Sequence, residues 1–435
     1  MVDPKQQQKL NEKMRVYIKT GLLIDGVGAN PIENGALLVQ NGVIQAVGSA
    51  TSFPLPEDSV LIDLSDFTVL PGLVDAHVHL IGDPEPGAFT ATQSENDERL
   101  LLRAIANSQK ALAAGLTTVR DCGGRGTITA SLEKAIGEGL VGGPRIVNCS
   151  APITTTGGHC YFLGQEAEGI DGVKQAVRKT HKAGADFVKV MVTGGGITPG
   201  SNSRASQYSQ AELSTIVEDA HRLGKRVAGH VHGTEGIARA AHAGFDTLEH
   251  VSWLARYQSD RDYDPKVVNE ILEKGIIVCR TIAGFERIPL EEASAGHKYW
   301  PDYEVFRNMV RDGIKLAAGT DAGIDYTPIS DYALTLETMA GLGAMNNREV
   351  IAAATINAAE ALGIDDQIGT LENGKRADLV AVKGNPYQDL RVLRNIDMVI
   401  QGGAITVIDG SLSFDQENAP NLFAKDGWGK LYLQK

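Results

Sequence analysis

Two histidine pairs are the strongest chemical signal in the sequence. His77 and His79 follow the apolar run VLPGLVDA, and His230 and His232 stand in RVAGHVHG. Side chains two residues apart on a strand point to the same side, so each pair should bring both imidazoles to one place. A single histidine on a strand is more often an ordinary hydrogen-bonded residue. Two at this spacing, at the end of a strand, favour a metal site.

Lys189 is the second signal, because it interrupts the apolar strand DFVKVMV at 186–192. Phe187, Lys189 and Met191 share one face of that strand. A buried ammonium is unfavourable unless it is paired or modified. One interpretation is a salt-bridged lysine, or a lysine whose charged end reaches solvent. The other is an N6-carboxylysine, whose carbamate is an anionic oxygen ligand able to bridge two cations.

Two further polar residues stand at the ends of predicted strands, His250 in FDTLEHV and Asp321 in LAAGTDAG. Each would be weak evidence alone. Together with the two histidine pairs and Lys189 they form a set of nitrogen and oxygen ligands that contains no thiolate. Such a set suits Zn²⁺, with Mn²⁺, Co²⁺ or Ni²⁺ as substitutes.

The segments that must position these residues show two patterns of predicted secondary structure. Short strands separated by Asn-Gly and Pro-rich turns fill residues 17–70, and the same style returns near the C-terminus in ADLVAVKG and DMVIQGGAITV. We expect both chain ends, 1–71 and 366–435, to form one small β-domain. Between them, in 72–365, eight short apolar strands alternate with amphipathic helices, one of them over 97–114. This alternation predicts a (β/α)₈ TIM-like barrel, whose chemistry lies at the C-terminal ends of its strands.

Composition limits the class of protein. The chain has 435 residues and a formal net charge of −13, which argues against nucleic acid as a partner. It contains no apolar run of the roughly 18 residues that cross a bilayer, so no membrane partner is expected. The polar start MVDPKQQQKLNEKM is not a signal peptide and predicts a cytoplasmic protein, with an exported mature enzyme as the alternative. The four cysteines, Cys122, Cys149, Cys160 and Cys279, are expected to be buried free thiols.

The motifs HVH, FVKV, GHVHG, LEH and GTDAG, with NGKRADLVAV near the C-terminus, resemble the amidohydrolase superfamily. The resemblance is to its binuclear branch of Xaa-Pro and Xaa-Arg dipeptidases, imidazolonepropionase-like proteins and ochratoxinase-type amidases, and it covers nearly the whole chain. It implies two divalent metal ions and a homo-oligomer, with an octamer as one possible form. It also implies the ligands: His77 and His79 for the more buried metal, His230 and His250 for the second, with carboxylated Lys189 and Asp321 completing the set.

Such a site predicts a mechanism. Two cations that share a water molecule lower its pKa toward neutrality. Asp321 is then placed to accept the proton and to deliver it later to the leaving amine. His232, on the same face as His230, is expected to donate a hydrogen bond to the substrate carbonyl or the tetrahedral intermediate rather than to bind metal.

Four further residues are candidates for substrate binding: His159 in TTTGGHCYF, Arg204 and Tyr208 in RASQYSQAEL, and Arg280 at the end of the seventh barrel strand. His159 and Tyr208 are named because the resemblance implies a contact with a substrate carboxylate, and a guanidinium can grip a carboxylate through two hydrogen bonds. The alternative is ordinary loop polarity. Aromatic residues could line a pocket for a large acyl group or could simply be core; they are Tyr161, Phe162, Trp253 and Phe285. His297 is at best part of a lid.

The expected function is hydrolysis of an amide or peptide bond in a small molecule, with release of a C-terminal amino acid. One alternative is a mononuclear deaminase or cyclic amide hydrolase of the same superfamily, against which Lys189 argues. The other is a non-enzymatic barrel used for binding or assembly. Such barrels lose ligands, whereas every ligand position is filled here.

Overall fold

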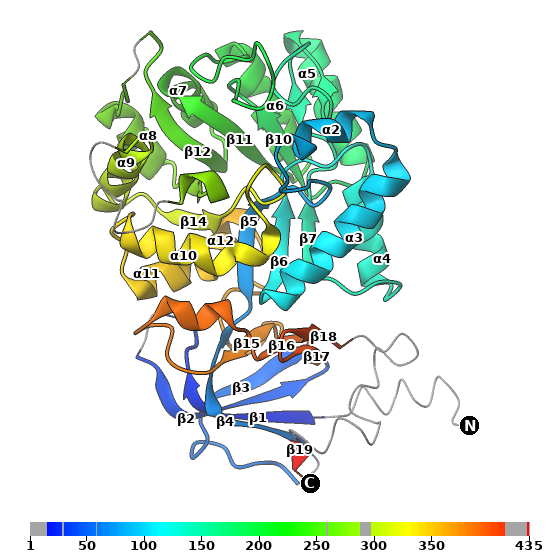
Figure 1. The fold of residues 1–435 in the computed structure, drawn as a ribbon, viewed down its shortest axis with the longest axis vertical. Coiled ribbons are helices and arrows are strands. Elements are labelled where there is room, and N and C mark those ends of the chain that lie inside the picture. The colour runs from blue at the N-terminus through cyan, green and yellow to red at the C-terminus, as the bar shows by residue number, and fades with distance from the viewer. Residues whose placement is uncertain are drawn as a thin grey trace.

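A ring of eight parallel strands carries the residues singled out above. The computed structural model describes residues 15–27, 30–57, 59–257, 260–287, 297–413 and 433–434, so the polar N-terminal segment discussed above lies outside the described residues. In chain order the ring consists of β5 (Leu73–Val78), β6 (Leu116–Asp121), β7 (Arg145–Asn148), β10 (Phe187–Met191), β11 (Arg226–Gly233), β12 (Thr247–Leu254), β13 (Ile277–Thr281) and β14 (Leu316–Gly319) (Figure 1).

The ring closes through backbone hydrogen bonds at two seams. Strands β5 to β7 and β10 to β14 each form a parallel ladder. Between β7 and β10, the Asp186 amide donates to the Asn148 carbonyl at 2.8 Å. Between β14 and β5, the Asp321 amide donates to the His77 carbonyl at 2.8 Å, and the His79 amide donates to the Ala322 carbonyl at 2.7 Å. The predicted eight-stranded barrel is therefore confirmed, and the second seam passes directly beside two predicted ligands.

Helices cover the outside of the barrel and bury their apolar faces against the strands. The first long one, α3, begins at an N-cap in which the Asn96 side chain accepts from the Arg99 amide, and α6 begins with a capping box between Ser209 and Glu212. The helices are α2 (Ala88–Ala91), α3 (Asp97–Ala113), α4 (Ile128–Gly137), α5 (Gly169–Lys182), α6 (Gln210–Arg222), α7 (Thr234–Ala243), α8 (Pro265–Glu273), α9 (Trp300–Arg311), α10 (Tyr332–Gly341), α11 (Asn347–Ala353) and α12 (Ile356–Leu362). Short 3₁₀ turns lie at Thr92–Ser94, Gly284–Glu286, Ile329–Asp331 and Leu390–Arg394, and β8 (Ile153–Thr154) pairs with β9 (Gln165–Glu166) beside β10.

The barrel interior below the site is filled by small apolar side chains and a few large ones. Ala76, Ala228 and Ala317 share one buried cluster with Phe187 and with three of the cysteines. All four cysteines are buried and free, as predicted.

The small β-domain is built from both ends of the chain, as predicted. Its strands are β1 (Arg15–Leu23), β2 (Ile32–Gln40), β3 (Val43–Ser49), β4 (Ser59–Pro71), β15 (Leu379–Val382), β16 (Met398–Gln401), β17 (Ala404–Ile408), β18 (Ser411–Leu412) and β19 (Leu433–Gln434). The long β4 joins the two ends, because it pairs with β1 on one edge and with β15 on the other. Asn41 and Gly42 turn β2 into β3 with positive φ angles of 55° and 73°, the conformation that an Asn-Gly hairpin turn requires.

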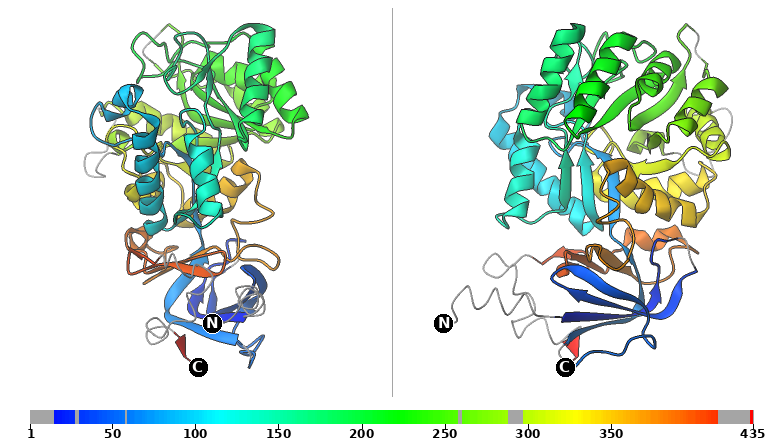
Figure 2. Two further views of the ribbon diagram at one scale, coloured as in Figure 1. Left: turned by 90° about the vertical axis from the view of Figure 1, so that its right-hand side faces the viewer. Right: turned by 180° about the vertical axis from the view of Figure 1, so that it is seen from behind.

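The β-domain packs against the end of the barrel at which β5 enters (Figure 2). Only Gly72 separates β4 from β5. Across the junction, Arg145 pairs with Asp378 at 2.8 Å, and the Gln401 side-chain amide donates to the Thr117 carbonyl at 2.9 Å. The β-domain has an apolar core of its own, which includes Ile18, Leu37 and Ile62. In the described part of the chain, no helix combines the length and the apolar character needed to cross a membrane.

Candidate active site

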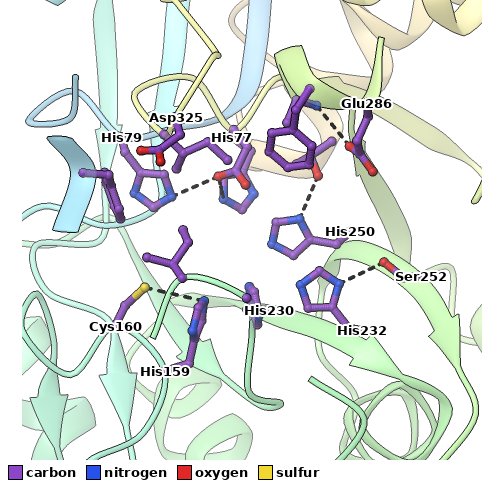
Figure 3. Close-up of a pocket in the computed structure, with 18 of the residues that line it drawn as sticks. His77, His79, His159, Cys160, His230, His232, His250, Ser252, Glu286 and Asp325 are labelled. Carbon is purple, nitrogen blue, oxygen red and sulfur yellow. Dashed lines mark hydrogen bonds and ion pairs between the residues drawn. The ribbon is translucent and has the colours of Figure 1, made fainter. Parts of the chain in front are cut away.

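A cavity of about 640 Å³ opens at the C-terminal ends of the barrel strands (Figure 3). We call it the active-site cavity. Its walls hold most of the residues that the sequence singled out, from seven different strands or the loops after them. Those on the walls are His77, His79, His159, Lys189, His230, His232, His250, Arg280 and Asp321.

His77 and His79, at the end of β5, converge on one carboxylate oxygen. Nε2 of His77 lies 3.2 Å and Nε2 of His79 lies 3.1 Å from Oδ1 of Asp321. Lys189 Nζ lies 3.5 Å from the same Nε2 of His77, and its side chain is 1% exposed. These four side chains therefore direct their donor atoms at a shared point inside the cavity.

Asp321 takes its position from a left-handed backbone conformation, with φ of 63°. The preceding Thr320 is tied to the buried Asp75 of β5, whose carboxylate accepts from both the amide and the hydroxyl of Thr320, at 3.1 and 2.6 Å. Asp75 also accepts from the His77 amide at 3.1 Å. One buried carboxylate thus sets the register between the two strand ends that carry His77 and Asp321.

The ring nitrogens of His77 and His79 that face away from the cavity both have acceptors. Nδ1 of His77 lies 2.9 Å from Oε2 of Glu249, and Nδ1 of His79 lies 3.1 Å from the Gly123 carbonyl. The approach at Gly123 is close: a Cβ there would stand 2.9 Å from the His79 ring. In a neutral imidazole, an Nδ1–H used in this way leaves Nε2 with its lone pair toward the cavity, which is how metal-binding histidines are commonly held.

His230, His232 and His250 form a second cluster, at the ends of β11 and β12. Their ring centroids are 4.5 to 4.7 Å apart. Each ring also has a partner outside the cluster: Gly194 O at 3.2 Å from His230 Nε2, Ser252 Oγ at 2.9 Å from His232 Nδ1, and Thr281 Oγ1 at 2.7 Å from His250 Nδ1. All three partners are neutral.

The end of β12 has an unusual backbone. His250, Val251 and Trp253 have positive φ angles of 68°, 52° and 53°. This region is costly for β-branched and bulky residues, and residues strained in this way cluster at functional sites. It interrupts the alternation of the strand, so that Glu249 and His250, adjacent in sequence, both reach the site from the barrel interior.

The electrostatics of the second cluster favour neutral imidazoles. Burial, together with the neighbouring histidines, lowers the pKa of His230 and of His250 well below the ordinary value. Burial also lowers the pKa of His232 to about 4 and that of His159 to about 3. A neutral imidazole is the form that binds a metal ion.

The first cluster behaves in the opposite way. Burial by itself lowers the pKa of His77, but Cys122 and Asp321 outweigh it and leave this pKa well above its ordinary value. Burial raises the pKa of Asp321, but His77 and the hydrogen bonds from His77 and His79 reverse that effect and hold the carboxyl ionised.

The donor set fits metal binding. Among the described residues, three groups of possible ligand atoms lie within 4.8 Å of one another: His230 with His232 and His250, His77 with His250 and Asp321, and His77 with Cys122 and Glu249. The first two groups face the cavity and consist of imidazole nitrogen and carboxylate oxygen, which are zinc-type ligands. Since His250 belongs to both of these groups, the two groups are continuous.

Of the predicted substrate-binding residues, His159 and Arg280 line the cavity, whereas Tyr208 and Arg204 do not. Tyr208 is 2% exposed, and its hydroxyl donates to the Ala167 carbonyl at 3.0 Å. Arg204 donates to the Ala255 carbonyl at 2.6 Å. Both side chains tie loops together, a role that their place in a loop sequence does not distinguish from substrate binding.

Of the four aromatic residues that the sequence singled out, one lines the cavity and three do not. Phe285 lines the cavity, while Trp253 is fully buried in the core and Phe162 packs against it. Tyr161 is 38% exposed and accepts a hydrogen bond from Gln93. The cavity instead takes its apolar surface from residues that the sequence did not single out, such as Phe89, Met191, Ile197, Tyr299 and Ile324. His297 is not on the wall, although its neighbours Lys298 and Tyr299 are.

Several supporting residues were also missed. Asp75, Arg120, Asp121 and Glu249 are buried charged residues on barrel strands. Asp121 accepts from the Leu80 amide at 2.8 Å and so fixes the chain just after His79. Charged residues inside the apolar strands LTTVRD and TLEH were the signal that could have identified Arg120, Asp121 and Glu249.

The barrel and its histidine-lined cavity define a hydrolase of the metal-dependent barrel class. The profile described as Amidohydrolase family matches residues 68–406, and the chain belongs to this family. Its relatives include the ochratoxinase of Aspergillus niger, 30% identical over 91% of this chain and 87% of that protein. An imidazolonepropionase of Mesorhizobium japonicum is 25% identical over 82% of this chain and 88% of that protein.

Solved structures agree with this assignment. A Xaa-Pro dipeptidase with methionine bound in its active site superimposes with a TM-score of 0.78 at 31% identity, covering 90% of this chain and 99% of that chain. The Aspergillus niger ochratoxinase structure gives 0.78 at 28% identity and covers 91% and 96%. The protein is therefore an enzyme of the amidohydrolase family that acts on amide bonds.

Proposed function

We propose that this enzyme hydrolyses the amide or peptide bond of a small substrate and releases a C-terminal amino acid, using two divalent metal ions, most simply Zn²⁺. The observation that carries the proposal is the convergence of imidazoles on one cavity together with Lys189 and Asp321. His77 and His79 would hold one ion and His230 and His250 the other. Lys189 and Asp321 would complete the set.

Lys189 supports the binuclear part of the proposal. Among the described residues no carboxylate lies within ion-pair distance of Lys189 Nζ. The polar contact of Nζ is with the imidazole of His77. A buried ammonium in that setting is unfavourable. The neutral amine can instead attack CO₂: the N–C bond forms, one C–O π bond becomes the carbamate oxyanion, and the amine proton leaves. The product is an anionic ligand that can reach two cations.

When bound, the metal ions would polarise the scissile carbonyl and lower the pKa of the attacking water. The protein's own residues do the rest. Asp321 is ionised and faces the cavity, so its free carboxylate oxygen can accept a proton from the water and return it to the leaving nitrogen. His232, oriented by Ser252, can donate a hydrogen bond to the oxygen on which negative charge develops.

The substrate class follows from the cavity walls. His159 is 3% exposed, and its Nδ1 has no hydrogen-bond partner within the described residues. Arg280, also on the wall, is paired with Glu286 at 3.1 Å. We assign these two side chains to the α-carboxylate of the released amino acid. The apolar part of the wall suits the acyl group. Two of the relatives, an ochratoxinase and a Xaa-Pro dipeptidase, support this choice.

The test is a screen of N-acyl amino acids and dipeptides, following the released amino acid, with metal content measured on the same protein. We expect about two metal ions per chain. An N-acyl amino acid should be cleaved at least 10²-fold better in kcat/KM than its methyl ester or carboxamide, a difference of about 3 kcal/mol. Equal values would refute carboxylate recognition but leave the metal chemistry standing. His159→Ala and Arg280→Met, measured singly, would show which side chain reads the carboxylate.

A cyclic amide is the second candidate, because an imidazolonepropionase is among the relatives. Including small cyclic amides in the screen separates the two. Cleavage of a cyclic amide alone, by a protein with one metal ion per chain, would replace the first proposal.

A further inference from the structure

A buried ion pair lies directly beneath the metal-ligand cluster. Arg120 of β6 and Glu249 of β12 are 2% and 0% exposed, and Arg120 Nη2 donates to Glu249 Oε1 at 2.7 Å. Two further donors of Arg120, Nε and Nη1, reach the Ala76 carbonyl at 2.7 Å and Thr247 Oγ1 at 3.0 Å. The Thr247 hydroxyl also donates to Glu249 Oε1, at 2.7 Å. The guanidinium and the hydroxyl thus occupy one oxygen of the carboxylate and hold it in a single orientation.

The other oxygen of Glu249 faces a proposed metal ligand. Oε2 lies 2.9 Å from Nδ1 of His77. The opposite nitrogen of that ring, Nε2, faces Asp321 and Lys189 in the cavity. The chain of contacts therefore runs from Arg120 through Glu249 to His77 and ends where a metal ion would bind. Arg120 and His77 come from neighbouring strands, while Glu249 reaches across the barrel from β12.

Glu249 could also be read as a ligand, since its carboxylate, Cys122 and His77 lie within 4.8 Å of one another. Two contacts argue against this. Both carboxylate oxygens already accept hydrogen bonds, and a cation on Oε1 would meet the guanidinium 2.7 Å away. Cys122 packs in the apolar cluster with Ala76. The alternative remains an outcome of the experiment below.

We propose that Glu249, held in place by Arg120, is a positioning residue that accepts the Nδ1 proton of His77 and thereby presents Nε2 of His77 to the metal. This inference rests on the proposed function, since it assumes a metal ion at His77. A carboxylate acceptor fixes the tautomer, sets the ring plane and makes Nε2 a stronger ligand than a neutral acceptor does. Because His250 has a positive φ, two adjacent residues of β12 would serve different metal ions. Glu249 would support the ligand His77 of one ion, and His250 would bind the other.

Removing Glu249 alone would leave a buried guanidinium unpaired and could unfold the protein. The test therefore compares two double variants without that charge, Arg120→Met/Glu249→Gln and Arg120→Met/Glu249→Leu. They have similar side-chain volume, but only the first keeps an acceptor for His77. Zn²⁺ affinity is measured by competition with a chelator, zinc content by elemental analysis, and folding by circular dichroism and the Tm of the metal-free proteins. Cys122→Ser is the control.

We expect the Leu variant to bind its tighter Zn²⁺ at least tenfold more weakly than the Gln variant, within the 10- to 100-fold range typical of such supporting partners, while the two metal-free proteins melt alike. Cys122→Ser should keep its full zinc content. Equal affinities of the two double variants would overturn the positioning role. A metal ion lost in Cys122→Ser would overturn it in favour of Glu249 as a ligand.

A measurement on the unaltered enzyme completes the test. Neutron diffraction from crystals of the zinc-loaded protein should show a deuteron on Nδ1 of His77, facing Glu249. A deuteron on Nε2 would overturn the inference even if neither double variant folds. The two proposals fail in different ways. Wild-type protein that takes up no zinc refutes the proposed function together with this inference. If the wild type takes up zinc but the two double variants bind it equally well, only the inference is refuted.

Discussion

The two halves of the candidate site are supported differently. In the β5 half, formed by His77 and His79, carboxylates do much of the supporting: Glu249 faces a ring nitrogen, and Asp75 and Asp121 accept from backbone amides on either side. In the β11–β12 half, formed by His230, His232 and His250, the partners are a backbone carbonyl and two hydroxyls. One half is thus supported by buried charge and the other by neutral dipoles.

This difference should separate the two metal ions in affinity. A carboxylate behind an imidazole makes the ring more basic, and it compensates the positive charge of a bound metal ion. A hydroxyl or carbonyl does this less. We therefore expect tighter binding in the β5 half than in the β11–β12 half.

The largest effect is expected from Lys189→Ala, because Lys189 is the residue proposed to join the halves. Without the bridging anion, turnover should fall by at least 10³-fold, which is about 4 kcal/mol, and at least one metal ion should be lost. Turnover with an N-acyl amino acid and elemental analysis measure both. Acetate or bicarbonate should partly rescue the variant. The control is Lys182→Ala, on the exposed surface of α5.

Near wild-type turnover with two metal ions in Lys189→Ala would show that Lys189 does not bridge the two metal ions. The two halves would then be independent sites.

Asp321→Asn should reduce turnover by 10²- to 10⁴-fold, because an amide cannot accept the proton. The amide can still lie beside His77 and His79, so at least one metal ion should remain. Single-turnover kinetics and metal content on the same sample separate these effects. A variant within about tenfold of wild type would exclude Asp321 as the general base, and one that loses both metal ions would show that Asp321 mainly binds metal.

The fold and the residues proposed to bind metal could be predicted from the sequence because they lie on regular strands or directly at their ends. Alternation places His77 with His79 and His230 with His232, and both pairs do face the cavity. Lys189 was recognisable because its strand is otherwise apolar. The barrel followed from the repeated strand–helix pattern, and the β-domain from the matching style of the two chain ends.

Prediction was weaker where the backbone leaves the regular pattern. Alternation would put Glu249 and His250 on opposite faces, and only the positive φ angles at the end of β12 bring both inward. Loop residues were harder still. Tyr208 and Arg204 have the side chains of a carboxylate-binding pair, but backbone carbonyls of neighbouring loops accept their hydrogen bonds. Nothing in the local sequence shows which way a loop side chain points.

The pH dependence of zinc uptake should sharpen the comparison. In the metal-free protein the raised pKa of His77 means that a proton must leave before zinc binds, so affinity in the β5 half should fall about tenfold per pH unit below that pKa. In the β11–β12 half burial holds the pKa values of the ligands His230 and His250 well below the ordinary value, so protons should compete much less with zinc there. Because Lys189 is proposed to serve both metal ions, any pH dependence that it adds to zinc affinity should be the same in both halves.

Two variants separate the halves for this measurement. His250→Ala should leave the pH-dependent site, and His79→Ala should leave the pH-independent one. Zinc affinity measured between pH 5 and 8 in each gives the two slopes. Equal slopes would mean that the different hydrogen-bond partners of the two halves do not change how protons compete with zinc for the ligands.

The smallest effect tests the neutral half itself. Thr281 Oγ1 lies 2.7 Å from Nδ1 of the buried His250, and Thr281→Val removes the hydroxyl at almost constant volume. The loss of one neutral hydrogen bond is worth about 1 kcal/mol, so the weaker zinc step should shift by roughly fivefold. The tighter step should not move, because no carboxylate in the β5 half contacts Thr281 in the described residues. Thr338→Val is the matched control, since among the described residues the Thr338 hydroxyl donates to the Leu334 carbonyl within α10, away from the cavity walls. Titration with a chelator that resolves both steps measures the shift. A shift of the tighter step instead would reverse the assignment of the two affinities, and a 100-fold shift of the weaker one would mean that a hydroxyl supports His250 as strongly as the carboxylate supports His77.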